Sequence, residues 1–313
     1  MDRNLALEFV RVTEAAAIAS ARWVGKGEGK LADAAAVDAM RARFNSIDFK
    51  AEVVIGEGAK DEAPELYVGE KLGSGKGPEM DIAVDPLEAT DSVAYGRTNS
   101  IAVIAAGPKG TLLRAPDVYM EKIAVGPQAK GAVRLGASVK ENIAMVAQYM
   151  GKPVGEVTVV ILDRPRHEEM IKEIRAAGAR VSLITDGDVA GAIATCLPDN
   201  PVDMLLGIGG SAESVLAAVA LKALGGEIFC RFHLKKEGDL EKIKTCGIDD
   251  VQSILSIEDM AKGQDLSFTA TGVIDGPLVK GVRFGSDYIT THSVAMRVRS
   301  GTVRYLETRH RNK

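Results

Sequence analysis

The sequence predicts an α/β protein with a mainly antiparallel sheet in the first half of the chain and a doubly wound, mostly parallel sheet in the second half. Three observations predict this class. Apolar residues recur at spacings of three and four along residues 2–25, which indicates a helix. Between residues 98 and 125, short apolar strands and close turns follow one another without a long helix. After residues 151–153, Gly-Lys-Pro, strand and helix patterns alternate, as in a parallel sheet.

We therefore expect two parts, residues 1–150 and 151–313, that form one functional unit. Glycines at 25, 27 and 29 end the first helix, and Gly, Pro and Ser-Gly turns separate the last strands. In the first part, the patterns predict helices at 2–25, 31–43 and 138–150 and strands at 51–55, 80–84, 98–106, 111–113 and 121–125. In the second part, they predict strands at 157–162, 180–184, 202–208 and 228–232, helices at 166–177, 189–196 and 211–224, and closing strands at 266–273, 278–284, 287–299 and 302–307.

Composition narrows the class of function. The 313 residues are 46% hydrophobic, which is ample for a large core, and the formal charge of −4 comes without a basic block. We therefore expect no nucleic-acid partner and no membrane partner. The start of the chain lacks the layout of a secretory signal, so the expected location is the cytoplasm. The four histidines and three scattered cysteines are too few for the usual zinc sites, so a metal site must depend on carboxylates.

The segment from 81 to 92, Asp-Ile-Ala-Val-Asp-Pro-Leu-Glu-Ala-Thr-Asp-Ser, is the most informative one. An apolar strand runs into Asp85, and Pro86 is expected to end the strand and begin a turn. The turn brings Glu88 back toward Asp85, with Thr90 beside both. Two carboxylates and a hydroxyl at such a junction suit Mg²⁺ or Mn²⁺, which take oxygen ligands. The alternative is an ordinary strand end in which Thr90 caps a helix.

For two more carboxylates in the first part, the sequence permits either a site role or an ordinary structural role. Asp33 either caps the helix over 31–43 or faces a site at the start of that helix. Glu57 lies between Gly56 and Gly58 after a strand, where there is room for an ion, or it is a solvated residue of a turn.

In the second part, polar residues follow three successive strands. Ligands of such sheets bind beyond the carboxyl ends of the strands. Arg164 and Arg166 suit phosphate, or they form a solvated pair at a helix start. Asp186 and Asp188 suit sugar hydroxyls, although Asp188 alternatively caps the next helix. Glu213, in the first turn of a helix, is either a further site carboxylate or an ordinary helix-start residue. The phenol of Tyr119 can donate a hydrogen bond to a phosphate, or Tyr119 is a half-buried structural residue. We expect His167 to be a surface residue.

A different class of function is suggested by residues 207–212, Gly-Ile-Gly-Gly-Ser-Ala. They fit the dinucleotide-binding pattern G-x-G-x-x-A between a strand and a helix. The acidic residue twenty positions on is Glu227, which precedes the next strand and so is badly placed for a ribose. A dinucleotide-binding dehydrogenase would also leave the carboxylates unexplained.

Taken together, these pieces resemble the class II fructose-1,6-bisphosphatases, the bacterial glpX-type family. The matching pieces run in the family's order along nearly the whole chain. They are residues 31–33, 54–58, 61–64, 81–90, 115–122, 125–127, 164–167, 186–188, 207–210 with Glu213, and 270–272. Any one of these pieces is a weak signal, but the ordered set is specific.

The resemblance implies a layered α-β-α-β-α fold shared with inositol monophosphatases and hydrolysis of the C1 phosphate of fructose 1,6-bisphosphate with Mn²⁺ or Mg²⁺. It implies metal ligands at Asp33, Glu57, Asp85, Glu88 and Glu213, and a water-activating role for Thr90. The substrate would be held by Glu88, Ala89, Thr90, Tyr119, Arg164, Pro165, Arg166, Asp186, Gly187, Asp188 and Gly210. Members of this family are often homo-oligomers, so we expect one here.

Two departures from the family pattern are visible. Ala89 stands where the family usually has Gly, which matters if this position has a positive φ. Arg164 stands where some relatives have Lys, which keeps the charge and changes the phosphate geometry.

A hydroxyl is too weakly basic to act alone, so we expect Thr90 to relay a proton to a carboxylate, and Asp33 is the candidate. Two rivals remain besides the dehydrogenase: sedoheptulose 1,7-bisphosphate as the substrate, alone or alongside, and a sugar-phosphate sensor without activity.

Overall fold

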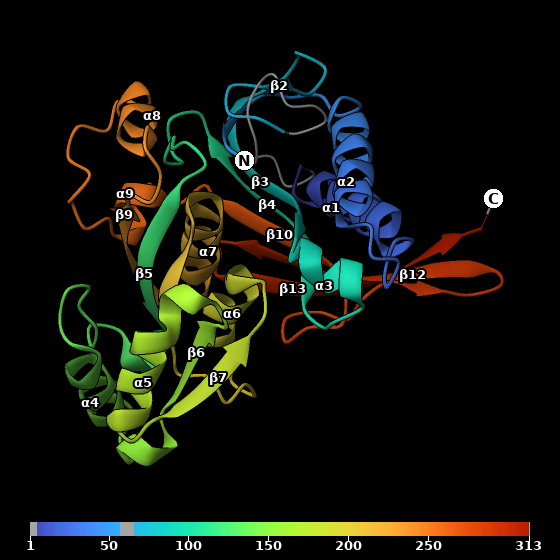
Figure 1. Ribbon diagram of the computed structural model, residues 1–313. Helices are drawn as coiled ribbons and strands as arrows, with labels where there is room; N and C mark the ends of the chain where they lie inside the picture. Colours follow the sequence, from blue (N-terminus) through green and yellow to red (C-terminus); the bar gives the residue numbers. More distant parts are fainter. Residues whose placement is uncertain (1–4, 57–65, 313) are drawn as a thin grey trace.

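The structure is a computed structural model that describes residues 5–56 and 66–312. Within them, an eight-stranded sheet and a five-stranded sheet are interleaved with helices, and this confirms the α/β class (Figure 1). The large sheet has the order β11-β12-β10-β4-β3-β1-β2, with β13 paired to β12. Its strands are β1 (Lys50–Ile55), β2 (Lys71–Leu72), β3 (Glu79–Glu88), β4 (Ser100–Pro108), β10 (Ser267–Ile274), β11 (Arg283–Phe284), β12 (Tyr288–Arg297) and β13 (Thr302–Arg311).

All neighbours in the large sheet are antiparallel except β1 and β3, which run parallel. The small sheet has the order β7-β6-β8-β5-β9. Here β6 is parallel to β7 and β8, while β5 is antiparallel to β8 and β9. The strands are β5 (Tyr119–Val125), β6 (Thr158–Leu162), β7 (Arg180–Ile184), β8 (Met204–Gly210) and β9 (Glu227–His233). The strands predicted at 157–162, 180–184, 202–208 and 228–232 therefore share a sheet, but β5 from the first half lies between β8 and β9.

The helices complete five layers. On the outer face of the large sheet, α1 (Leu5–Ala21) and α2 (Gly29–Phe44) share a core cluster with β3 and β4. Between the sheets lie α6 (Asp188–Ala194) and α7 (Ser211–Leu224). On the far face of the small sheet, α4 (Val139–Met150) and α5 (Glu168–Ala176) pack against β6 and β8. Short helices lie at the edges: α3 (Thr90–Tyr95), α8 (Asp239–Thr245), α9 (Ile257–Met260), and the 3₁₀ turns η1 (Pro127–Ala129), η2 (Val154–Glu156) and η3 (Pro165–His167).

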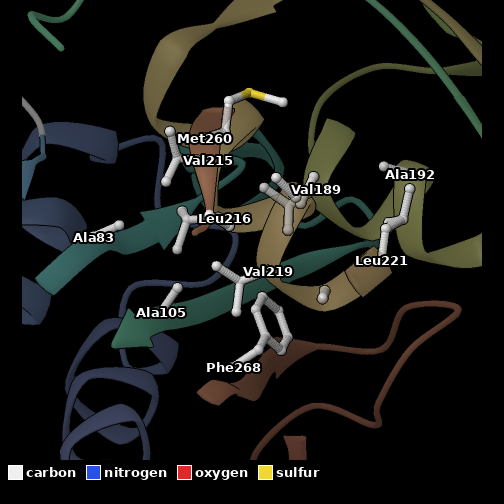
Figure 2. Close-up of a cluster of buried hydrophobic side chains, with 14 of the residues drawn as sticks. Ala83, Ala105, Val189, Ala192, Val215, Leu216, Val219, Leu221, Met260 and Phe268 are labelled. Atoms are coloured by element: carbon white, nitrogen blue, oxygen red, sulfur yellow. The ribbon is translucent and has the colours of Figure 1, made fainter. Parts of the chain in front are cut away.

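The sequence of strand β4 is apolar at nearly every position because both faces of the strand are buried. Ile101, Val103 and Ala105 belong to the core between the sheets, whereas Ala102, Ile104 and Ala106 belong to the core under α1 and α2. Successive side chains of a strand point to opposite faces, so a sheet covered on both faces needs apolar residues at every position. Figure 2 shows the central cluster, in which α7 places Val215, Leu216 and Val219 among side chains of the large sheet and α6.

Several local predictions were wrong. The segment at 111–113 has only an isolated bridge at Leu112, and of the strand predicted at 278–284 only Arg283–Phe284 forms. Strand β3 does not end before Pro86 but continues to Glu88, because the pairing with β4 shifts between Asp85 and Glu88. A bulge of this kind accommodates proline, which has no N–H to donate. Of the two interpretations of Asp33, the structure excludes the helix cap, since α2 begins at Gly29 and Glu28 holds the cap position.

The division into residues 1–150 and 151–313 stays a prediction. Both sheets take strands from both sides of residue 150: β5 joins the small sheet, and β10 to β13 join the large one. Among the described residues, the helices include none with both the length and the apolar character needed to cross a bilayer.

Candidate active site

A cleft of about 320 Å³ lies where the end of β3 meets the ends of the small sheet's strands. Most residues predicted for the site line it, although they come from both halves of the chain. The lining residues are Asp85, Leu87, Glu88, Ala89, Thr90, Asp91, Tyr119, Leu162, Arg164, Arg166, Asp186, Gly187, Asp188, Gly209, Gly210 and Glu213. A larger cavity of about 650 Å³ adjoins it and shares Tyr119, Gly210 and Glu213 with the cleft.

The bulge at the end of β3 holds the first two carboxylates. Asp85 accepts a 3.0 Å hydrogen bond from the backbone N–H of Leu87 through Oδ1. Glu88 accepts a 2.7 Å hydrogen bond from the backbone N–H of Val189 in α6 through Oε1. Both side chains are buried, at 2% and 4% exposure. The bulge therefore turns two acidic side chains inward, and Glu88 reaches α6, the helix that follows β7 of the small sheet.

Ala89 has a φ of 70°, in the left-handed region. This is the position where the sequence carries Ala in place of the family's usual Gly. A left-handed conformation costs an alanine roughly 1 kcal/mol more than a glycine. The turn therefore contains a strained alanine directly beside Glu88 and Thr90.

Thr90 is the first residue of α3, and its hydroxyl donates a 3.1 Å hydrogen bond to the carbonyl of Leu87. A hydroxyl has one proton to donate and two lone pairs. Since the proton is committed to Leu87, the oxygen can accept a hydrogen bond from a water molecule in the cleft.

Asp33 reaches this region from α2. A side chain at Gly29 would come within 3.2 Å of Thr90, so the start of α2 packs against Thr90. Asp33 lies four residues further on and therefore on the same face of the helix. Its charge also contributes to the raised pKa of Asp85. Asp33 thus lies close to the cleft without lining it.

The carboxylates of the cleft raise one another's pKa values. Burial, followed by the charges of Glu88 and Glu213, raises the pKa of Asp85 well above its ordinary value. Burial and the charge of Asp188 do the same for Glu88. For Glu213, burial and Asp188 raise the pKa to about 7, and Lys122 opposes the shift. Such a group of buried acids is stabilised by a positive charge among them.

The opposite wall of the cleft is basic. Arg166 donates from Nε and Nη2 to the carbonyl of Ile208, at 3.0 and 2.8 Å, and its guanidinium lies 5.0 Å from the ring centre of Tyr119. Arg164 lies 3.7 Å from the carboxylate of Asp186. Arg166 is therefore fixed in place, with its remaining N–H groups available to an anion, and Pro165 between the two arginines begins η3.

The loop carrying Asp186, Gly187 and Asp188 is fixed from the large sheet. Asn99, itself in a left-handed conformation, donates from Nδ2 to the carbonyls of Asp186 and Gly187 at 3.3 and 3.2 Å. A Cβ at Gly187 would lie 2.6 Å from that Nδ2. Glycine is therefore favoured at 187, where φ is also 82°. Of the two interpretations of Asp188, the helix cap is excluded because Gly187 holds the cap position of α6.

His167 is buried and not a surface residue as expected. Its Nε2 accepts a 2.8 Å hydrogen bond from the N–H of Ile208, and its Nδ1 lies 2.8 Å from the carbonyl of Leu162. In this tautomer Nδ1–H donates to Leu162. The neutral ring joins the ends of β6 and β8, and burial lowers its pKa. Its role is to support the strand ends.

The donor set of the cleft fits a hard divalent cation. Its buried donors are carboxylate oxygens that repel one another, and such oxygens are the ligands that Mg²⁺ and Mn²⁺ prefer. Within the described part of the chain, no three acidic, histidine or cysteine side chains are already gathered as ligands of one ion. Glu57, the remaining predicted ligand, lies outside the described residues.

Sequence reasoning missed two groups at the site. Lys122 is buried beneath the cleft and paired with Asp188, and Asn99 holds the loop at 186–188. Lys122 lies between Met120 and Ala124 on the apolar face of its predicted strand, and this was a usable signal. The hypothesis of a dinucleotide-binding dehydrogenase finds no support. Glu227, the acid that would bind the ribose, begins β9, and its carboxylate accepts a 2.8 Å hydrogen bond from the N–H of Gly131.

Comparison with known proteins identifies the relatives of this chain. Residues 3–310 match the family model described as bacterial fructose-1,6-bisphosphatase, glpX-encoded. The class 2 fructose-1,6-bisphosphatase of Haemophilus influenzae is 45% identical over 99% of this chain and 97% of that protein. The fructose-1,6-bisphosphatase 1 class 2 of Escherichia coli is 44% identical over 99% of this chain and 96% of its own length.

A solved structure, the extragenic suppressor from Pyrococcus furiosus, is 13% identical over 61% of this chain and 70% of that one, with a TM-score of 0.32. A likeness of this extent adds nothing to the fold described above. The match over residues 3–310 and the identity to the two bacterial enzymes are sufficient: the chain belongs to the glpX-encoded family of bacterial fructose-1,6-bisphosphatases.

Proposed function

We propose that this chain hydrolyses the C1 phosphate of fructose 1,6-bisphosphate, giving fructose 6-phosphate and phosphate, with Mn²⁺ or Mg²⁺ as the cofactor. The observation that carries the proposal is the meeting of buried carboxylates from β3 and α7 with two arginines around one cleft. A phosphorylated sugar needs both walls, because cations neutralise the reacting phosphate and arginines bind the other one.

Asp33, Asp85, Glu88 and Glu213, together with Glu57, would hold the cation. A divalent cation bound there neutralises phosphate charge and lowers the pKa of a water molecule. The chain's own residues supply the rest. Thr90 accepts a hydrogen bond from the attacking water, and Asp33, on the helix face that packs on Thr90, receives the proton. Excluding bulk water from the buried acids strengthens these interactions.

The sugar and its second phosphate would lie against the other wall. Arg164, Arg166 and Tyr119 present donors to the phosphate, and Pro165 begins the η3 turn between the two arginines. Asp186, Gly187, Asp188 and Gly210 face the same cleft and present oxygen acceptors to the sugar hydroxyls. Ala89 and the backbone around it form the turn against which the C1 phosphate rests.

The assay is phosphate release from fructose 1,6-bisphosphate by the full chain, with Mn²⁺, with Mg²⁺ and with a chelator. Sedoheptulose 1,7-bisphosphate is included to measure preference. The variants Thr90→Ala and Glu213→Gln are each expected to lower kcat by at least about a hundredfold, the size of effect typical of a lost proton-transfer or charge-stabilising group. Near-parental rates in both variants would overturn the assigned roles, and a metal-independent rate would overturn the cofactor.

We also propose that the chain acts as a homo-oligomer in the cytoplasm. The observation supporting association is strand β13, which pairs on one side with β12 and carries Tyr305 at 60% exposure. The observation supporting a reducing compartment is that Cys196, Cys230 and Cys246 are free thiols. Sedimentation at assay concentration tests the first of these proposals.

A further inference from the structure

Lys122 is a buried cation directly behind the cleft. It lies in β5, and its side chain is 2% exposed. Residues two positions apart on a strand share a face, and Met120 and Ala124 belong to the core between the sheets. The stem of Lys122 therefore runs through that core, and its ammonium group ends at the strand ends that form the cleft. A lysine this deeply buried requires partners for its charge.

The partners come from the loop after β7 and from the end of β8. The Nζ of Lys122 lies 2.8 Å from Oδ2 of Asp188 and donates a 3.1 Å hydrogen bond to the carbonyl of Gly210. Gly209 makes this contact possible. A Cβ at Gly209 would lie 2.0 Å from Oδ2 of Asp188 and 2.9 Å from Nζ of Lys122. The ion pair thus occupies the space that a side chain at 209 would fill.

The two oxygens of Asp188 are used differently. Oδ2 is held by Lys122, whereas Oδ1 has no hydrogen-bond partner within the described residues and is buried. Asp188 also lines the cleft. A buried carboxylate oxygen without a donor is costly, so a ligand group with a proton to donate is favoured there.

We propose that Lys122 is a positioning residue for substrate binding: it holds the carboxylate of Asp188 in the orientation in which Oδ1 accepts a hydrogen bond from a hydroxyl of the sugar. The inference rests on the proposed function for the identity of the sugar. Lys122 itself touches neither phosphate. Its effect passes through Asp188 and belongs to binding, whereas Thr90 and the carboxylates of β3 act in the hydrolytic step.

The chain contains a matched control for a purely structural ion pair. At the opposite end of β8, Lys152 lies 2.5 Å from Asp203, which also accepts a 2.7 Å hydrogen bond from the N–H of Thr158. Asp203 is buried, as Asp188 is. Lys152→Met therefore removes a lysine–aspartate pair at the other end of the same strand, where the lysine is more exposed, at 23%, and neither residue lines the cleft.

The experiment measures calorimetric binding of fructose 6-phosphate in the presence of a chelator. This ligand lacks the C1 phosphate, so its binding does not depend on the cation. The proteins are the wild type, Lys122→Met, Asp188→Asn, the double variant Lys122→Met/Asp188→Asn, and Lys152→Met. Phosphate release from fructose 1,6-bisphosphate with Mn²⁺ is measured in parallel.

We expect Lys122→Met to weaken binding by about tenfold or more, the effect of a lost hydrogen bond to a charged group. KM should rise by a similar factor, with kcat changed by less. In the Asp188→Asn background, Lys122→Met should add little, because the neutral amide needs no cation. The double variant also leaves no lone buried charge, so it remains foldable if Lys122→Met alone does not. Lys152→Met should bind as the wild type does.

Parental binding by Lys122→Met would overturn the inference. So would a loss of equal size in the wild-type and Asp188→Asn backgrounds, since that result indicates a general structural effect. The two proposals fail in different ways. A wild type that binds fructose 6-phosphate but releases no phosphate contradicts the proposed function, and the binding cycle still decides the role of Lys122. A wild type that does not bind the sugar phosphate contradicts both.

Discussion

Oε1 of Glu88, at the end of β3, accepts a 2.7 Å hydrogen bond from the backbone N–H of Val189 in the first turn of α6. Through this bond the large sheet contacts α6, the helix that follows β7 of the small sheet, at the cleft. A carboxylate has a second oxygen, so Glu88 can hold α6 and a cation at the same time. The position of the predicted metal site therefore depends on how the two sheets are packed.

Two substitutions separate these roles of Glu88. Glu88→Gln keeps an oxygen that accepts from Val189 but removes the charge. We expect unchanged or higher stability of the metal-free protein, because a buried acid with a raised pKa has been removed, together with weaker Mn²⁺ binding. Glu88→Ala leaves the N–H of Val189 unsatisfied and should lose about 1–3 kcal/mol of unfolding free energy. Urea unfolding in chelator measures both, and equal stabilities of the two variants would contradict the bond's role.

Ala89→Gly should stabilise the protein by about 1 kcal/mol, because the φ of 70° favours glycine. The control is Ala94→Gly in α3, the helix that follows Ala89, where the backbone is ordinary α-helix and glycine should lower the stability by about 0.5–1 kcal/mol. Urea unfolding of the two variants should thus give shifts of opposite sign. A loss of stability in Ala89→Gly would show that the alanine methyl group contributes more packing than strain.

Part of the fold was readable from the sequence because it depends on local pattern. Apolar residues at helical spacing marked α1, and continuous apolar runs marked β4 and β6, which are buried on both faces. The sequence did not predict which strands pair with each other. Strand β5 joins β8 and β9 through contacts distant in the chain, and local periodicity carries no information about such partners.

The stabilisation by metal should grow with pH. Burial and neighbouring acids raise the pKa values of Asp85, Glu88 and Glu213, the last to about 7. Between the ordinary carboxyl pKa and the raised one, the folded metal-free protein holds protons that the unfolded chain has lost, so its stability falls as pH rises. A cation must displace those protons.

Adding a chelator to the Mn²⁺-loaded protein should therefore lower the unfolding temperature more at pH 8 than at pH 6. Thermal unfolding with and without chelator measures the difference. In Glu213→Gln, which has one fewer titrating acid, the difference between the two pH values should shrink. An equal chelator effect at both pH values would mean that these acids are already ionised in the metal-free protein.

His167 gives a pH dependence of the opposite sign. Burial lowers its pKa, so below the ordinary value near 6.5 the unfolded chain binds a proton that the folded protein excludes. Stability should fall as pH drops through this range, by at most about 1.4 kcal/mol per pH unit for this one proton. Urea unfolding at several pH values should show a smaller slope for His167→Gln than for the wild type. Equal slopes would mean that the ring is protonated in the folded state.

The residues of the site could be predicted where they lie close together in the sequence or follow a rule of the fold class. Asp85, Glu88 and Thr90 lie within one short segment, and the polar strand ends at 164–166 and 186–188 follow a rule of parallel sheets. The pair formed by Lys122 and Asp188 was missed because the two residues are distant in the chain and only the packed fold brings them together. Pro86 inside β3 was missed because the bulge depends on the partner strand.

Mn²⁺ binding followed by electron paramagnetic resonance tests the central claim most directly. Asp85→Asn on β3 and Glu213→Gln on α7 are compared with the wild type and with Glu121→Gln, whose carboxylate pairs with Arg231 away from the cleft. If acids from both elements hold one cation site, each of the first two variants weakens Mn²⁺ binding by at least about tenfold and Glu121→Gln does not. Wild-type affinity in either Asp85→Asn or Glu213→Gln would contradict a site shared by β3 and α7.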